Sequence, residues 1–270
     1  MSIRRWIFIG VTLLSGACGG KFQPTLELDG HWVVDHGFDD DCKVTVSFYD
    51  NQMMALSFYS LAEGACQPER YGIRGDAVLI DIASKKDYVD GDGALATELQ
   101  ILVHDLWLRK TLRLTETASG LRAVIVSSED NEMELLKPLL NQNFTLAAVP
   151  TDWFLQLRGE WDAGCDPVKL SGSCEILEFR SDVIGQHRMY EKCNEELECD
   201  IHRHTTDFLY GLRHREVLSD GTYKIDIVIF GPGSGDRPAG QSLSMIVSAE
   251  SIEMEGFETL TRPKKLPVVR

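Results

Sequence analysis

The chain has 270 residues, 43% of them hydrophobic, and carries 42 acidic against 27 basic side chains, a formal net charge of −15. This hydrophobic content supports a packed core and excludes a chain that is disordered throughout, and the length suits one large domain or two of ordinary size. An acidic surface repels phosphate backbones and anionic headgroups, which argues against nucleic acid as a partner.

The chain opens with the features of an export signal. Arg4 and Arg5 precede an apolar run over residues 6–14, and the small residues that follow lead to Cys18. The run is too short for a membrane-spanning helix, and its charged start and small-residue end are typical of a secretory signal. A cysteine directly after the small residues makes this leader resemble the signal of bacterial lipoproteins.

This resemblance implies a lipid anchor. Residues 1–17 would be the signal peptide, and Cys18 would carry acyl chains such as palmitate and become the new N-terminus of a lipidated tether over residues 18–25. Gly19 after the cysteine, where a retention signal would have aspartate, implies sorting to the outer membrane, on its periplasmic face or at the cell surface. The acyl anchor would then be the contact with the membrane.

The remaining cysteines agree with export. An even number of them in an exported chain predicts disulfides, because the periplasm is oxidising. A zinc site would need paired cysteines two to four residues apart, and no such pair exists. The six cysteines are Cys42, Cys66, Cys165, Cys174, Cys193 and Cys199.

An internal repeat organises the rest of the chain. Residues 26–32 and 155–161 both read L-x-L-x-G-x-W, each follows a Pro-Thr pair, and each copy ends with a basic residue before proline. Agreement at both ends of two copies of similar length predicts two homologous domains. We expect domain 1 over residues 26–140, a linker over 141–152 and domain 2 over 153–270.

Within each copy, apolar residues recur at every second position. Val44, Val46 and Phe48 alternate with polar residues in the first copy, as Ile225 and Ile227 do in the second. This period is typical of antiparallel strands with one buried and one wet face, and no stretch shows a sustained helical stripe. We predict an all-β protein with two tandem small antiparallel up-and-down β-barrels, because closure removes exposed sheet edges.

The motif residues suggest a family. Gly30 and Gly159 stand two positions before Trp32 and Trp161, and this Gly-x-Trp on the first strand, with a basic residue near the last, resembles the lipocalin-like domains of exported bacterial proteins. In that family the tryptophan plugs the closed end of the barrel under a basic side chain. The resemblance implies that the structural motif is completed by Lys137 over Trp32 and by Arg262 over Trp161. A sheltered cation over an indole contributes about 1 kcal/mol or more.

One disulfide is expected in the first domain. Cys42 opens a predicted strand, and Cys66 follows the strand that returns from the turn at Asp50 and Asn51. The two cysteines can therefore lie side by side at the open end of one hairpin, and we expect them to pair.

The second domain leaves three pairings open. Nested pairing around a turn at Ser181 and Asp182 keeps the two cysteines of each pair at comparable distances from the turn, and it ranks first. A local arrangement closes shorter loops and gains less from unfolded-state entropy, whereas a crossed arrangement preserves longer spacings. The nested pairs are Cys174–Cys193 and Cys165–Cys199, the local pairs are Cys165–Cys174 and Cys193–Cys199, and the crossed pairs are Cys165–Cys193 and Cys174–Cys199.

Histidines in the second copy are weak metal candidates. His202 and His204 are spaced so that both would point to the same face of a strand, and His187 and His214 could supply a third ligand. Arginines crowd the same stretch and disfavour a divalent ion, so we predict a solvated basic face and no metal or cofactor.

No sequence motif indicates catalysis. There is no nucleophile elbow and no H-E-x-x-H, which favours a non-catalytic protein. By the family resemblance, we expect it to bind a small apolar or amphipathic ligand. The alternative is a structural or protein-interaction lipoprotein with solid barrels, no small-molecule ligand and another envelope protein as its partner.

Overall fold

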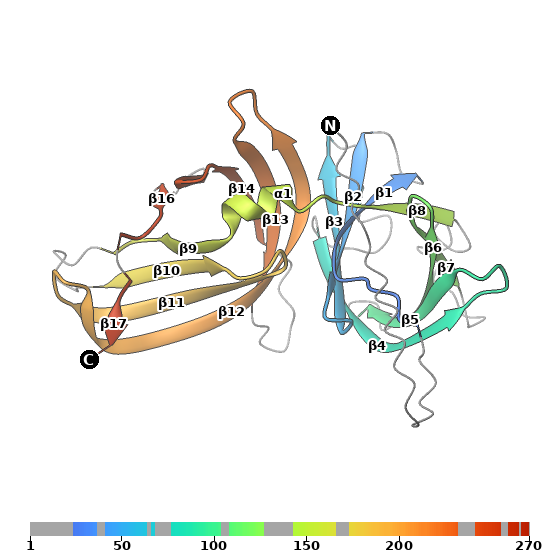
Figure 1. The fold of residues 1–270 in the computed structure, drawn as a ribbon, viewed down its shortest axis with the longest axis horizontal. Coiled ribbons are helices and arrows are strands. Elements are labelled where there is room, and N and C mark those ends of the chain that lie inside the picture. Colours follow the sequence, from blue (N-terminus) through green and yellow to red (C-terminus); the bar gives the residue numbers. More distant parts are fainter. Residues whose placement is uncertain are drawn as a thin grey trace, which may run out of the picture.

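The computed structural model describes residues 24–36, 41–63, 66–67, 77–103, 108–126, 143–165, 173–231, 241–254, 259–264 and 266–269. The predicted leader, Cys18 and the tether as far as residue 23 lie outside the described residues, as does Lys137. The described residues form two antiparallel β-barrels in tandem (Figure 1).

Barrel 1 closes from eight strands in chain order, and β8 pairs with β1. Each strand is antiparallel to the next, which is an up-and-down meander. The strands are β1 (Gly30–His36), β2 (Cys42–Tyr49), β3 (Met53–Ser60), β4 (Ala77–Val89), β5 (Leu95–Val103), β6 (Leu108–Thr117), β7 (Gly120–Val126) and β8 (Asn143–Ala148).

Barrel 2 repeats this architecture after one short helix, α1 (Asp152–Leu157). Its long strand β12 pairs with β11 along its first half and with β13 along its second half, which closes the barrel. The strands are β9 (Gly159–Asp162), β10 (Cys174–Phe179), β11 (Ile184–Cys193), β12 (Glu198–Val217), β13 (Tyr223–Phe230), β14 (Gln241–Val247), β15 (Ser251–Met254), β16 (Leu260–Thr261) and β17 (Val268–Val269), which runs parallel to β12. The predicted all-β class with two tandem antiparallel barrels is confirmed.

The boundary between the domains differs from the prediction. The segment expected to be a linker, residues 141–152, contains β8, which pairs with both β7 and β1 and closes barrel 1. Phe144 and Leu146 alternate with polar or small residues in that strand and are buried in the barrel. Domain 1 therefore extends beyond residue 140, and only residues 149–151 separate β8 from α1.

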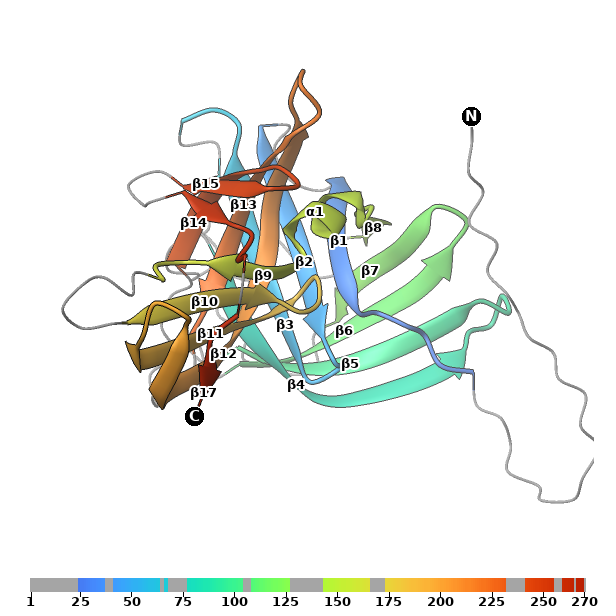
Figure 2. The ribbon, with the colours of Figure 1, turned by 60° about the vertical axis from the view of Figure 1, so that its left-hand side comes forward.

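The chain before β1 closes one end of barrel 1. Leu26 and Leu28 are buried in the core, and the indole N–H of Trp32 donates to the Leu28 carbonyl at 2.8 Å. Lys85 Nζ donates to the Leu26 carbonyl at 2.7 Å and to Asn51 Oδ1 at 3.0 Å, which ties the segment to β4 and to the β2–β3 turn. Figure 2 shows this dark blue segment running from the start of β1 toward the end of β4.

The closed end of barrel 2 is built on the same tryptophan geometry. Trp161 is fully buried, and its indole N–H donates to the Leu157 carbonyl, four residues earlier, as Trp32 does to Leu28. Gly30 and Gly159 share a φ of +111°, a backbone conformation that favours glycine. The helix α1 takes the place of the extended segment, so Leu155 is exposed even though its counterpart Leu26 is buried.

The two barrels pack directly against each other through β2 and β3 on one side and β12 on the other (Figure 1). An apolar cluster at this interface joins Tyr49, Ala55 and Ala77 to Val228 and Phe230. The expectation of a wet outer face is wrong for β2 and β3, because Thr45, Ser47 and Ser57 on that face are buried between the barrels.

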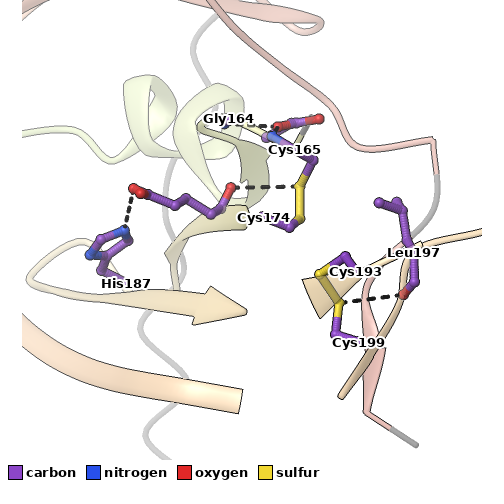
Figure 3. The surroundings of a disulfide bond; sticks show 9 residues. Gly164, Cys165, Cys174, His187, Cys193, Leu197 and Cys199 are labelled. Atoms are coloured by element: carbon purple, nitrogen blue, oxygen red, sulfur yellow. Dashed lines mark hydrogen bonds and ion pairs between the residues drawn. A yellow bond between two sulfur atoms is a disulfide. The ribbon is translucent and has the colours of Figure 1, made fainter. Parts of the chain in front are cut away.

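Three disulfides tie strand ends together. Cys42 pairs with Cys66, as expected, at a Cα–Cα distance of 4.9 Å. In barrel 2 the nested pairing ranked first is wrong, as is the crossed one, and the local pairs are formed side by side (Figure 3). Strand β11 is longer than β10, so Cys174 lies opposite Tyr190, while Cys193 lies opposite Cys199 on β12. The local pairs are Cys165–Cys174 and Cys193–Cys199.

Candidate functional site

Barrel 1 encloses a cavity of about 90 Å³ that is partly open to solvent. Its lining consists of apolar side chains alone, and they come from every strand of the barrel. Small-molecule sites are also lined mainly by apolar side chains, but they usually enclose about 300–1,000 Å³, so this cavity has room for only part of a ligand. The lining includes Val46, Leu56, Ile101, Leu112, Ala123 and Phe144.

The cavity extends from the level of Val46, the strand partner of Trp32, toward the end of barrel 1 that lies away from Leu28. Its lining side chains belong mostly to the last parts of β1, β3, β5 and β7 and to the first parts of β2, β4 and β8. In an antiparallel barrel these parts meet at one end, which we call the mouth. The Cys42–Cys66 disulfide joins the start of β2 to the chain after β3 at this mouth.

The lining has no polar side chain that could form a hydrogen bond with a polar atom inside the cavity. Burial of an unpaired amide or hydroxyl costs on the order of 1–3 kcal/mol in proteins. The cavity therefore suits a hydrocarbon chain end and not a hydrogen-bonding group, which would have to stay at the mouth.

A second cluster lies between the barrels and involves a buried histidine. His31 Nδ1 is 2.7 Å from Ser47 Oγ, and His31 Nε2 is 2.6 Å from the Asp182 carbonyl oxygen. A carbonyl only accepts, so Nε2–H donates to Asp182 and Nδ1 accepts the Ser47 hydroxyl. The pair has the spacing of a nucleophile and its base, but Ser47 is 0% and His31 4% exposed. Its role in this structure is to link β1 and β2 of barrel 1 to the β10–β11 turn of barrel 2.

Further polar contacts hold the same interface. The Arg213 guanidinium on β12 donates to the Phe58 carbonyl at 2.7 and 3.1 Å, and the Thr45 hydroxyl donates to the Arg213 carbonyl at 3.2 Å. The rings of Tyr59 and His214 stack with centroids 4.3 Å apart. These contacts hold β2 and β3 of barrel 1 against β12 of barrel 2.

The His31 contacts predict a pH dependence of stability. Burial lowers the pKa of His31, and nearby Asp182 offsets only part of this effect. Above about pH 6.5, the pKa of an unfolded histidine, the neutral His31 ring contributes its full stability to the folded protein. Below that pH the unfolded chain binds a proton more readily than the folded protein does, so the free energy of unfolding falls. We expect His31→Gln to cost about 1–3 kcal/mol at pH 7 and less at pH 5. Urea unfolding of both proteins at the two pH values measures this, and a constant difference would contradict it.

The histidines proposed as weak metal ligands do not converge. His187 Nε2 is 3.1 Å from Glu175 Oε2 (Figure 3), and the His202 ring lies 5.1 Å from that of Tyr190. His204 contacts Thr206, and His214 stacks on Tyr59 at the barrel interface. Burial lowers the pKa of His214, with a further contribution from the nearby charge of Lys43. Within the described ranges no three histidine, cysteine or acidic residues are grouped to hold a metal ion.

The tryptophan motif is complete in barrel 2. The Arg262 guanidinium carbon lies 3.6 Å from the centroid of the Trp161 ring, the contact that the family resemblance implies. Arg262 also donates to the carbonyls of Gln156 and Arg158. The corresponding contact of Trp32 with Lys137 falls on a residue outside the described part of the chain, as does the lipidation site Cys18.

Comparisons with protein families, with curated proteins and with solved structures find no match to this chain. In the part of the chain that the structure describes, no helix is both long enough and apolar enough to cross a bilayer.

No sequence pattern marks the cavity residues as a site. The alternating apolar residues of β2 and β5 indicate which side chains face inward, but they do not show whether the interior is filled. The sequence also does not indicate that His31 and Ser47 are buried, because polar residues at alternate positions are typical of the solvent-exposed face of a strand. The sequence signal that bears on this pair is His31 itself, inside the repeated motif where the second copy has Glu160.

Proposed function

We propose that this protein is a lipid-anchored, non-catalytic protein of the bacterial outer membrane that binds a small amphipathic molecule through its apolar part. The observation that supports it is the apolar, partly open cavity of barrel 1. A solid first barrel would have no such space, so the cavity favours ligand binding over the alternative of a purely structural lipoprotein.

The size and lining of the cavity favour a flexible chain. About 90 Å³ is small for a rigid polycyclic ligand but can take the end of an alkyl chain. Each buried methylene contributes about 0.8 kcal/mol, so a few carbons give measurable affinity. The polar head of such a molecule would remain hydrated at the mouth.

Cavity filling tests this proposal. Ala123 lines the cavity and is 4% exposed, so Ala123→Leu places three more carbons in the space. Exclusion of a similar number of ligand methylenes should weaken the binding of a fluorescent long-chain fatty acid about ten-fold or more. Titration of the purified protein by fluorescence measures the change.

The control is the same substitution at Ala83, an exposed position on β4 of the same barrel. Ala83→Leu should bind the fatty acid as the unchanged protein does. Equal binding by the Ala123→Leu and Ala83→Leu variants, or no binding by the unchanged protein, would refute a chain site in this cavity.

The proposed anchor gives a separate prediction. Cys18→Ser should move the protein from the membrane fraction to the soluble fraction, because stable attachment needs acyl chains and a chain with 42 acidic against 27 basic side chains is not attracted to anionic headgroups. Both barrels should stay folded, which circular dichroism checks. A serine variant that still sediments with membranes would contradict acylation at Cys18.

The proposal includes no reaction. The Ser47 hydroxyl and the His31 ring, which have the spacing of a nucleophile and its base, lie buried between the barrels, where a substrate cannot reach them.

A further inference from the structure

We infer that the mouth of barrel 1 faces away from the membrane to which Cys18 is anchored, so that ligand enters from the aqueous side and not from the anchoring bilayer. This inference rests on the acylation of Cys18 in the proposed function. It also rests on where the chain leaves barrel 1 and on the distances that this sets.

The N-terminal segment leaves barrel 1 at its closed end. Lys85 holds the Leu26 carbonyl and the side chain of Asn51, so the segment lies against the β2–β3 turn and the second half of β4. Most of the cavity lining lies toward the other ends of these strands, although Met54, directly after the turn, also contributes. Figure 2 shows residues 24–29 running toward the end of β4, where Val89 is located.

The tether sets the greatest distance of this end from the membrane. Six residue steps separate Cys18 from Pro24, and a fully extended chain spans at most about 3.3–3.6 Å per residue. Whatever path residues 18–23 take, Pro24 therefore lies within about 20 Å of the acylated cysteine.

The height of the barrel exceeds this reach. Strand β4 has 13 residues and runs from the mouth to the closed end. At about 3.3 Å per residue it is about 40 Å long, and a tilt of 35–45° leaves about 30 Å along the barrel axis. If the mouth rested on the bilayer, the end of β4, toward which residues 24–29 run, would be about 30 Å above it. The tether reaches at most about 20 Å from Pro24, so Cys18 could not reach the bilayer in this orientation.

The surface near the closed end fits a membrane-facing but not membrane-inserted position. Glu27, Asp29, Asp50 and Asp92 are exposed there. Carboxylates are repelled by anionic headgroups, so this end would lie above the bilayer, held by the acyl chains.

Energy transfer to a membrane acceptor tests the orientation. Val89, at the closed end, and Leu61, directly after β3 at the mouth, are matched sites because they are 51% and 49% exposed. The Val89→Cys and Leu61→Cys variants are expressed as the acylated full chain, labelled with the same donor dye and placed in phosphatidylcholine vesicles with an acceptor on the headgroups. We expect a several-fold higher transfer efficiency from the label at position 89.

The outcomes separate the inference from the proposed function. Equal transfer from both labels, or higher transfer from position 61, would overturn the orientation while leaving the anchor intact. No transfer from either label would overturn both, because the protein would not be on the vesicles. The same labels in a Cys18→Ser background give the zero level.

A longer tether provides a second test. Insertion of 20 glycine and serine residues between Gly20 and Lys21 raises the greatest reach to about 90 Å, which allows the mouth to approach the bilayer. The ratio of the two transfer efficiencies should then fall toward one. A ratio that does not change would show that the tether is not what sets the orientation.

Discussion

Replacing Trp161 by alanine is expected to lower the free energy of unfolding by about 3–5 kcal/mol, the usual cost of deleting a large buried aromatic side chain. The indole is 0% exposed and belongs to the core of barrel 2. Its N–H bond to the Leu157 carbonyl fixes the end of α1 over the barrel, so the substitution also loses this contact.

Arg262 should contribute to the same unit. Its guanidinium lies 3.6 Å from the Trp161 ring centroid and donates to backbone carbonyls of α1 and its flanks at Gln156 and Arg158. Arg262→Ala should therefore cost less than Trp161→Ala, and the double variant should be less destabilised than the sum of the two, because the residues are in direct contact.

Urea unfolding of the single and double variants with intact disulfides measures this coupling. Additive effects would contradict an energetic contact between the two side chains. Trp32→Ala is the matched control in barrel 1, where the same indole-to-carbonyl bond joins a tryptophan that is only partly buried. It should cost less than Trp161→Ala.

The sequence predicted the parts of the fold that depend on local patterns. Alternation in β2 and β13 is matched by buried Val46, Phe48, Ile225 and Ile227. The repeat of Gly-x-Trp also predicted equivalent positions, and the structure gives the two glycines the same φ and the two tryptophans the same bond. These features follow from short stretches of chain, where composition and period specify the conformation.

Features that depend on contacts between distant segments could not be predicted. The sequence of β8 was predicted to be a linker, because only two large apolar residues alternate in it, Phe144 and Leu146, and Pro150 follows closely. Its pairing with the distant strand β1 makes it part of the barrel. The disulfides of barrel 2 depend on the unequal lengths of β10 and β11. Burial of Ser47 and Ser57 depends on β12 of the other barrel, which no local pattern reveals.

The candidate site was predictable only in kind. The family resemblance implied a small apolar or amphipathic ligand, but the volume left inside a barrel depends on how side chains from eight strands meet. Leu112 and Phe144, for example, are both buried and both line open space. Alternation predicts that such residues face inward and gives no information on the gap between them.

Replacing Gly120, at the start of β7, by alanine is expected to lower the free energy of unfolding by about 2–5 kcal/mol. The residue has a φ of +151°, and a Cβ there would lie 2.1 Å from the Leu146 carbonyl oxygen and 3.2 Å from its carbon. These are backbone atoms of β8, whose pairing with β7 places Leu146 opposite Leu121. The strands cannot separate without a loss of ladder bonds, so strain of about 1–2 kcal/mol adds to an overpacking cost of about 1–3 kcal/mol.

Gly93 provides the matched control, because it also lies in barrel 1 with a positive φ, +84°, and a Cβ there would meet nothing within 4 Å. Gly93→Ala should therefore cost only about 1 kcal/mol, the conformational part of the effect. Denaturant unfolding of both variants isolates the clash as their difference. Because Leu146 lines the cavity, Gly120→Ala should also weaken fatty-acid binding, whereas Gly93→Ala should not. Equal stability of the two variants would show that β7 and β8 are not packed as closely as the structure places them.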